Sequence, residues 1–114
     1  MNKEELARRI KTLKELISKE PSSSFLILNP INLFYFTGAF FRGALLITNE
    51  GLKAFIKRPA NVLLDLPGAQ VIQLKSLKDL LSHLTKGKVY VDLNCLSFSE
   101  AQRLLRVLSG YEVL

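Results

Sequence analysis

Residues 29–38 read Asn-Pro-Ile-Asn-Leu-Phe-Tyr-Phe-Thr-Gly, and the fold of the surrounding chain depends on them. They follow an apolar run from Ser24 to Leu28 that has the composition of a β-strand. Pro30 has no N–H to donate to a central strand, so this strand must end near Asn29. Proline suits the first position of a helix, Asn29 suits its cap, and Gly38 is able to release the backbone afterwards. The stretch therefore predicts a strand that turns sharply into a short aromatic helix.

The segment before this stretch carries a helical pattern. From Lys3 to Glu20, apolar side chains recur every three or four residues, at Leu6, Ile10, Leu13 and Ile17. This spacing places them on one stripe, so we expect an amphipathic helix that lies on a core. The run from Phe25 to Leu28 is continuously apolar, which is typical of a strand buried on both faces. A strand of this kind implies helices on both sides of the sheet.

Turn-forming residues divide the rest of the chain into alternating strands and helices. Ala44–Thr48 and Leu52–Lys57 flank a turn that contains Gly51, which predicts an antiparallel hairpin. Three further helices are expected: a short one opened by Pro59, one with a Ser76/Asp79 capping box that ends at Gly87, and one capped by Ser97 and Glu100 that runs to Gly110. Three further strands are expected over Gln70–Leu74, over Lys88–Asp92 and from Tyr111. This alternation predicts one α/β domain over residues 1–114, with a mixed β-sheet of about five to six strands flanked by helices on both faces.

Composition and charge restrict the class of protein. The 114 residues suffice for one domain, and 48% hydrophobic with 23% charged residues is typical of a globular chain. The net charge of +6 arises from basic residues scattered among Glu and Asp, so we interpret them as solvated faces and expect no nucleic-acid partner. Cys95 is the only cysteine, which excludes an intrachain disulfide. The sequence has neither a signal-peptide pattern nor an uninterrupted apolar span, and it predicts a cytoplasmic protein without a membrane partner.

Few residues have the pattern of a catalytic or metal site. The single histidine, His83, lies in a leucine-rich segment without a second ligand at metal-binding spacing, and it is better interpreted as a surface or helix-end residue. Cys95 is better interpreted as a small buried thiol than as a nucleophile. No glycine-rich phosphate loop occurs, which argues against a nucleotide cofactor. We therefore expect no catalytic residue, metal ion or cofactor in this chain.

The segment Phe40-Phe41-Arg42 is the exception. Two consecutive phenylalanines in an extended connection do not easily both face inward, so we expect at least one of them to be exposed to a partner surface. The forked donors of Arg42 suit a carboxylate. The segment is thus a candidate binding surface.

The run from Asn29 to Gly38, followed by Gly43-Ala-Leu-Leu-Ile-Thr, resembles the amino-terminal domain of the Xaa-Pro aminopeptidase, prolidase and creatinase family. The resemblance covers nearly the whole chain, from the opening helix with Arg8 and Arg9 to Arg58 and the later elements. It implies a mixed sheet with helices on both faces and a ribonuclease H-like motif. It also implies that the domain precedes a larger pita-bread domain, which holds two divalent metal ions, expected to be manganese, and cleaves peptides at proline. We accordingly expect the chain to be the amino-terminal domain without that catalytic domain.

For the candidate binding surface, the resemblance implies a role across a dimer. In the family, the loop after the Tyr-x-Thr-Gly element helps to close the active site of the partner subunit. By resemblance, Phe40, Phe41 and Arg42 are therefore substrate-binding candidates that act in trans. The expected partners are the catalytic domain of the parent protein, a second copy of the chain and, through the complete enzyme, a peptide substrate.

The remaining motif residues, Asn32, Tyr35, Thr37 and Gly38, are interpreted as structural, because buried amide and hydroxyl groups require hydrogen-bond partners such as neighbouring backbone. Two alternatives to a peptidase domain stay open. One is a free-standing binding or adaptor module that keeps the fold and uses its basic surface. The other is the amino-terminal domain of a creatinase-like hydrolase that acts on a small guanidino acid.

Overall fold

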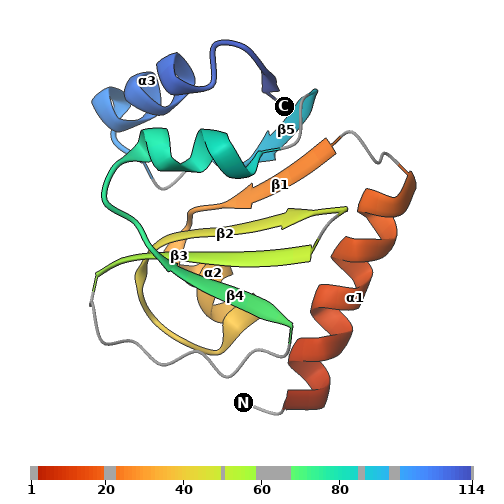
Figure 1. Ribbon diagram of the computed structural model, residues 1–114. Helices are drawn as coiled ribbons and strands as arrows, with labels where there is room; N and C mark the ends of the chain where they lie inside the picture. The colour runs from red at the N-terminus through yellow and green to blue at the C-terminus, as the bar shows by residue number, and fades with distance from the viewer. Residues whose placement is uncertain are drawn as a thin grey trace.

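The strands form one sheet in the order β4-β3-β2-β1-β5-β6 in the computed structural model (Figure 1). The structure describes residues 3–19, 23–49, 51–58, 68–84, 87–92 and 96–113. In these ranges the strands are β1 (Ser23–Ile27), β2 (Arg42–Thr48), β3 (Gly51–Arg58), β4 (Ala69–Gln73), β5 (Lys88–Val91) and β6 (Glu112–Val113). Only β2 is antiparallel to its neighbours among these strands, and the other five share one direction. The predicted mixed sheet is confirmed.

Helices cover both faces of the sheet, as predicted. They are α1 (Lys3–Lys19), α2 (Pro30–Thr37), the 3-10 helix η1 (Leu77–His83) and α3 (Phe98–Val107). Because successive side chains of a strand point to opposite faces, Leu45 and Ile47 of β2 join the core beneath α1 and α2. Ala44 and Leu46 join the core beneath η1 and α3. Helices on both sides of the sheet (Figure 1) and these two cores explain why β2 is continuously apolar over Ala44–Ile47.

The helix and hairpin predicted around β1 are confirmed. Leu6, Ile10 and Ile17 of α1 are buried against the sheet, and Leu13 is partly buried beside them. Strands β2 and β3 pair antiparallel from Thr48, opposite Gly51, along their whole length. An amphipathic stripe and a glycine turn are local signals, which is why the sequence predicts both elements well.

The short aromatic helix forms as the sequence predicts. Pro30 is its first residue, and the Asn29 side chain accepts a hydrogen bond from the Ile31 N–H at 2.9 Å. At the other end, Gly38 adopts the left-handed conformation with φ 76°, and its N–H donates to the Phe34 carbonyl at 2.8 Å. A residue with a side chain would be strained in that conformation, so glycine closes α2.

The element after β4 differs from the prediction. It is a 3-10 helix that ends at His83, whereas the sequence predicts a helix with a capping box that continues towards Gly87. The Asp79 carboxylate accepts from the Ser76 N–H at 3.0 Å, but the Ser76 hydroxyl accepts from the Lys78 N–H at 3.4 Å, not from that of Asp79. Only half of the capping box forms: the acidic side chain accepts its hydrogen bond, whereas the serine hydroxyl accepts from Lys78 instead of Asp79.

Element boundaries account for the remaining differences. Strand β2 begins at Arg42, two residues before the predicted start, and α3 ends at Val107 instead of Gly110. His83 ends η1, and its ring packs edge-on against the Phe55 ring with the ring centres 5.1 Å apart. The short helix predicted from Pro59 and the predicted buried thiol of Cys95 lie outside the described residues.

Candidate functional site

The candidate residues lie at the edge of the sheet where the parallel strands end. Strands β1, β3 and β5 end there at Ile27, Arg58 and Val91, and the antiparallel β2 begins there at Arg42. Helix α2 starts at the same edge, directly after β1. Crevices outside the carboxyl ends of parallel strands are the usual ligand sites of open α/β sheets. The topology therefore brings α2, Arg42 and the end of β5 together.

Asp92 fastens the start of α2 to the end of β5. One carboxylate oxygen accepts from the Leu28 N–H at 2.6 Å, and the other accepts from the Asn29 N–H at 3.1 Å. The second oxygen also accepts from Asn32 Nδ2 at 2.9 Å. The predicted structural role of Asn32 thus rests on a side-chain partner, not on backbone. Sequence reasoning missed Asp92, because the pairing of β5 with β1 that brings its carboxylate to α2 is not encoded by a local pattern.

The Thr37 side chain stabilises the carboxyl end of α2 through hydrogen bonds with the backbone. This side chain is buried, and its hydroxyl donates to the Leu33 carbonyl at 2.6 Å. The same oxygen accepts from the Ala39 N–H at 3.2 Å, just beyond Gly38. Both ends of α2 therefore have side-chain hydrogen bonds, which fix the direction in which residues 39–42 leave it.

Tyr35 contacts α1 through Arg9. The Arg9 guanidinium lies over the Tyr35 ring, 3.8 Å from its centre, and Nη1 donates to the Tyr35 carbonyl at 2.6 Å. Its Nη2 forms an ion pair with Glu5 at 2.8 Å. A guanidinium suits this position because it can stack on a ring and donate in its own plane at the same time. Arg9 thus joins α1 to α2.

Phe40, Phe41 and Arg42 point in different directions. The Phe40 side chain is 67% exposed and stacks on Phe34 with the ring centres 4.2 Å apart. The Phe41 side chain is 4% exposed and packs in the core beneath α1 and α2. Arg42 is exposed at the start of β2. The expectation that at least one phenylalanine is exposed is confirmed, and the structure presents Phe40 and Arg42 to solvent with Phe41 as a buried anchor between them.

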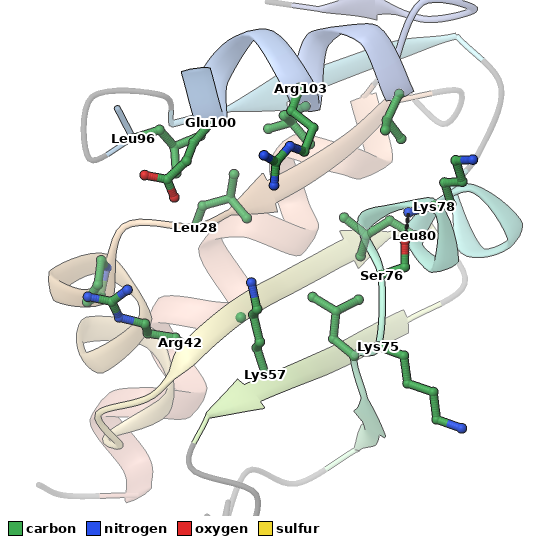
Figure 2. Close-up of a pocket in the computed structure, with 15 residues that line it drawn as sticks. Leu28, Arg42, Lys57, Lys75, Ser76, Lys78, Leu80, Leu96, Glu100 and Arg103 are labelled. Carbon is green, nitrogen blue, oxygen red and sulfur yellow. Dashed lines mark hydrogen bonds between the residues drawn. The ribbon is translucent and has the colours of Figure 1, made fainter. Parts of the chain in front are cut away.

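Arg42 also lines a cavity of about 530 Å³ between the sheet edge, η1 and α3 (Figure 2). Glu100 of α3 lies beside it. Hydrogen bonds from the side chain and backbone of Ser97, and then the charges of Arg42 and Lys57, lower the pKa of the Glu100 carboxyl below its ordinary value of 4.5. A carboxylate that stays ionised next to Arg42 offsets part of the positive charge of the lining.

The described residues offer no ligand set for a metal ion. No three His, Cys, Asp or Glu side chains in those ranges gather closely enough to hold one. In the same part of the chain, no helix has both the length and the apolar character needed to cross a bilayer.

Comparison with known proteins identifies what this arrangement resembles. A model of the creatinase/prolidase N-terminal domain matches residues 9–114. No curated protein gave a significant match.

Solved structures share the fold. The chain is similar to an Xaa-Pro aminopeptidase from Streptococcus thermophilus, with a TM-score of 0.78 and 19% identity over 95% of this chain and 89% of that one. An Xaa-Pro aminopeptidase from Streptococcus pyogenes gives a TM-score of 0.76 and 21% identity over 96% and 90% of the two chains. An X-Pro aminopeptidase from Thermotoga maritima gives a TM-score of 0.74 and 18% identity over 92% of this chain, which spans 32% of that longer protein.

Proposed function

Because the chain belongs to the creatinase/prolidase N-terminal domain family, we propose that it is the non-catalytic amino-terminal domain of an Xaa-Pro aminopeptidase or dipeptidase. On this proposal, hydrolysis takes place in a second domain of the complete enzyme, which supplies the two divalent metal ions. The names of the proteins with this fold, Xaa-Pro aminopeptidases and a prolidase among them, support the proposal. The contribution of this chain is then to recognise the substrate and to form the dimer.

The observation that carries this role is the way in which Phe40 and Arg42 are presented. Both side chains are exposed, while the residue between them is 4% exposed and packed in the core. The preceding helix is fixed at both ends by Asp92 and Thr37. Because the backbone before Arg42 is already ordered, a substrate carboxylate that binds the guanidinium has only the side chain of Arg42 to immobilise. We assign this contact to Arg42 and the adjoining apolar contact to Phe40.

Exposed apolar side chains on α2 support a contact with a second copy of the chain. Ile31 is 74% exposed and Tyr35 is 47% exposed, and their spacing of four residues places them on one side of the helix. Phe40, 67% exposed, follows immediately after α2. Large apolar side chains grouped in this way are typical of protein interaction surfaces. The proposed dimer buries this side of α2 and brings Arg42 to the active site of the partner.

The first test is kinetic. In the complete enzyme, Arg42→Ala should raise the KM for an Xaa-Pro peptide by about tenfold or more, because one hydrogen-bonded ion pair with the substrate is lost. The turnover number should change much less. Arg106→Ala is the matched control, since Arg106 is an exposed arginine of α3 outside the cavity lining. An unchanged KM for Arg42→Ala would remove the assignment.

Mixed dimers test whether Arg42 acts in trans. One subunit would carry Arg42→Ala with an intact metal site, and the other would carry wild-type Arg42 with a substituted metal ligand. If Arg42 serves the partner subunit, half of the active sites in the mixed dimer combine an intact metal site with an intact arginine, and a low KM should return. If the mixed dimer keeps the high KM, Arg42 acts within its own subunit and the proposed arrangement is wrong.

A further inference from the structure

The cavity at the sheet edge has a mixed lining of which the proposed function uses only Arg42. Its wall on the sheet side and beneath the helices is apolar and includes Leu28, Leu80 and Leu104. Five basic residues also line it: Arg42 from β2, Lys57 from β3, Arg103 from α3, and Lys75 and Lys78 near the start of η1. Its volume of about 530 Å³ lies in the range of small-molecule sites.

A β-bulge directs Lys57 into this cavity. In the pairing of β2 with β3, Gly43 lies opposite Ile56 but Arg42 lies opposite Arg58, so Lys57 is the extra residue. Bulges of this kind bend a strand and re-aim a side chain. Phe55, two residues earlier, lies in the core beneath η1 and α3, so Lys57 leaves the sheet on the same side.

Two of the cations point towards each other across the cavity. Figure 2 shows Lys57 extending from the sheet into the cavity and the Arg103 guanidinium extending towards it from α3. Within the described ranges, the side chains of Arg42, Lys57 and Arg103 form no hydrogen bond or ion pair. Glu100 is the one acidic residue of the lining, and its carboxylate already accepts from the Ser97 N–H at 3.3 Å. Five basic residues and one engaged carboxylate leave an excess of positive charge above an apolar wall.

We propose that this cavity binds a small organic anion, a carboxylate or phosphate group carried on an apolar body. The acidic group lies between Lys57 and Arg103, and the apolar body rests on Leu28, Leu80 and Leu104. Charge complementarity favours binding of the acidic group, and removal of the apolar body from water contributes the remaining binding free energy. This site is distinct from the proposed contact with a peptide substrate, since neither Lys57 nor Arg103 takes part in that contact.

The test measures binding of defined probes to the 114-residue chain by isothermal titration calorimetry. Octanoate and octyl phosphate combine an acidic group with an apolar body, acetate and inorganic phosphate supply the acidic group alone, and hexanol supplies an apolar body alone. At least one of the two combined probes should bind at least tenfold more tightly than every single-feature probe. The tighter of the two combined probes identifies the preferred headgroup.

Matched variants locate the site. Lys57→Gln and Arg103→Gln should each weaken binding of the better probe about tenfold, as expected for the loss of one hydrogen bond to a charged group. Lys57→Arg and Arg103→Lys, which keep the charge, should retain most of the affinity. Lys11→Gln and Lys14→Gln remove the same charge from exposed side chains of α1 that lie outside the cavity lining, and these should weaken binding less than twofold.

Three results would overturn the proposal. Absence of binding by both combined probes would exclude the site. Equal binding of acetate and octanoate together with equal binding of the two phosphates would mean that the apolar wall contributes nothing. Equal losses in Lys57→Gln and Lys14→Gln would reduce the effect to attraction by the net charge of the chain. Because Arg42 stays unchanged throughout, these results leave the kinetic test of the proposed function independent.

Discussion

At the scale of single residues, Gly43 has the narrowest tolerance for substitution. It follows the β-bulge, and a Cβ atom built on it would lie 1.8 Å from the Phe55 carbonyl oxygen. The obstructing atom is backbone of the neighbouring strand, so relief requires β2 and β3 to move apart. We expect Gly43→Ala to lower the free energy of unfolding by about 2 kcal/mol or more, measured by urea denaturation.

The control for this substitution is Gly110→Ala. A Cβ atom at Gly110 meets nothing within 4 Å, so this variant should unfold within about 0.5 kcal/mol of the wild type. A Gly43→Ala protein as stable as the control would show that the two strands separate freely at the bulge.

Asp92 is the second residue whose substitution should be costly. Its carboxylate accepts three hydrogen bonds, from the backbone of Leu28 and Asn29 and from the side chain of Asn32. Asp92→Ala leaves these donors unpaired in a partly buried position, so we expect a loss of about 2–4 kcal/mol in denaturant unfolding. Asp92→Asn should also destabilise the protein, since an amide group turns donors towards one of the same N–H groups.

Asp79 provides a comparison for Asp92 on the surface. Its carboxylate also accepts from two backbone N–H groups, those of Lys75 and Ser76, but the residue is exposed. Water can replace the lost acceptor there, so Asp79→Ala should cost about 1 kcal/mol or less. Losses of similar size for Asp79→Ala and Asp92→Ala would mean that burial does not determine the importance of Asp92.

At the scale of elements, the capping box of α3 should make stability depend on pH. Hydrogen bonds from the Ser97 side chain and backbone lower the pKa of Glu100 below 4.5, the nearby charges of Arg42 and Lys57 adding to the effect. A group whose pKa is lower in the folded state stabilises it fully above its unfolded pKa and loses that contribution as the pH falls through the folded pKa. The stability difference between the wild type and Glu100→Gln should therefore be greatest above pH 4.5 and shrink at lower pH, measured by unfolding at a series of pH values.

The partner residue provides the control for the capping box. Ser97→Ala removes one of the two hydrogen bonds that Glu100 shares with Ser97. In the Ser97→Ala background, the loss of stability caused by Glu100→Gln should therefore vary less with pH. An effect of the same size in both backgrounds would mean that the Ser97 hydroxyl does not contribute, and would assign the pH dependence to the Ser97 backbone N–H and the charges of Arg42 and Lys57.

The elements also show which signals in the sequence suffice to predict where a helix begins and ends. Asn29, Pro30 and Gly38 mark the ends of α2 correctly, because a cap, a first-turn proline and a left-handed glycine act within a few residues of each other. The Ser97/Glu100 pair opens α3 as predicted, while the similar Ser76/Asp79 pair opens a 3-10 helix. In both pairs the acidic side chain accepts from the serine N–H, but the serine hydroxyl accepts from Glu100 N–H in the first pair and from Lys78 N–H in the second.

At the scale of the whole molecule, long-range pairing limits what the sequence reveals. The alternation of strands and helices predicts a mixed sheet with two covered faces, and both features are confirmed. The strand order places β5 beside β1, and no local pattern encodes that neighbourhood. The contact of Asp92 with α2 depends on this strand order, and the approach of Arg103 to Lys57 depends on the packing of α3 on the sheet. Sequence reasoning therefore found neither contact.

The single antiparallel strand has a consequence for the order in which the chain assembles. Strands β1, β2 and β3 follow one another closely, so they can form a meander from local contacts. The pairing that brings Asp92 to Leu28 joins residues 64 positions apart and must first close a long loop. During synthesis from the amino terminus, we expect the meander to exist before β5 has been made. The start of the aromatic helix would then lack its contact with Asp92 until β5 has been made, and the edge that presents Phe40 and Arg42 would take its final shape later than the meander.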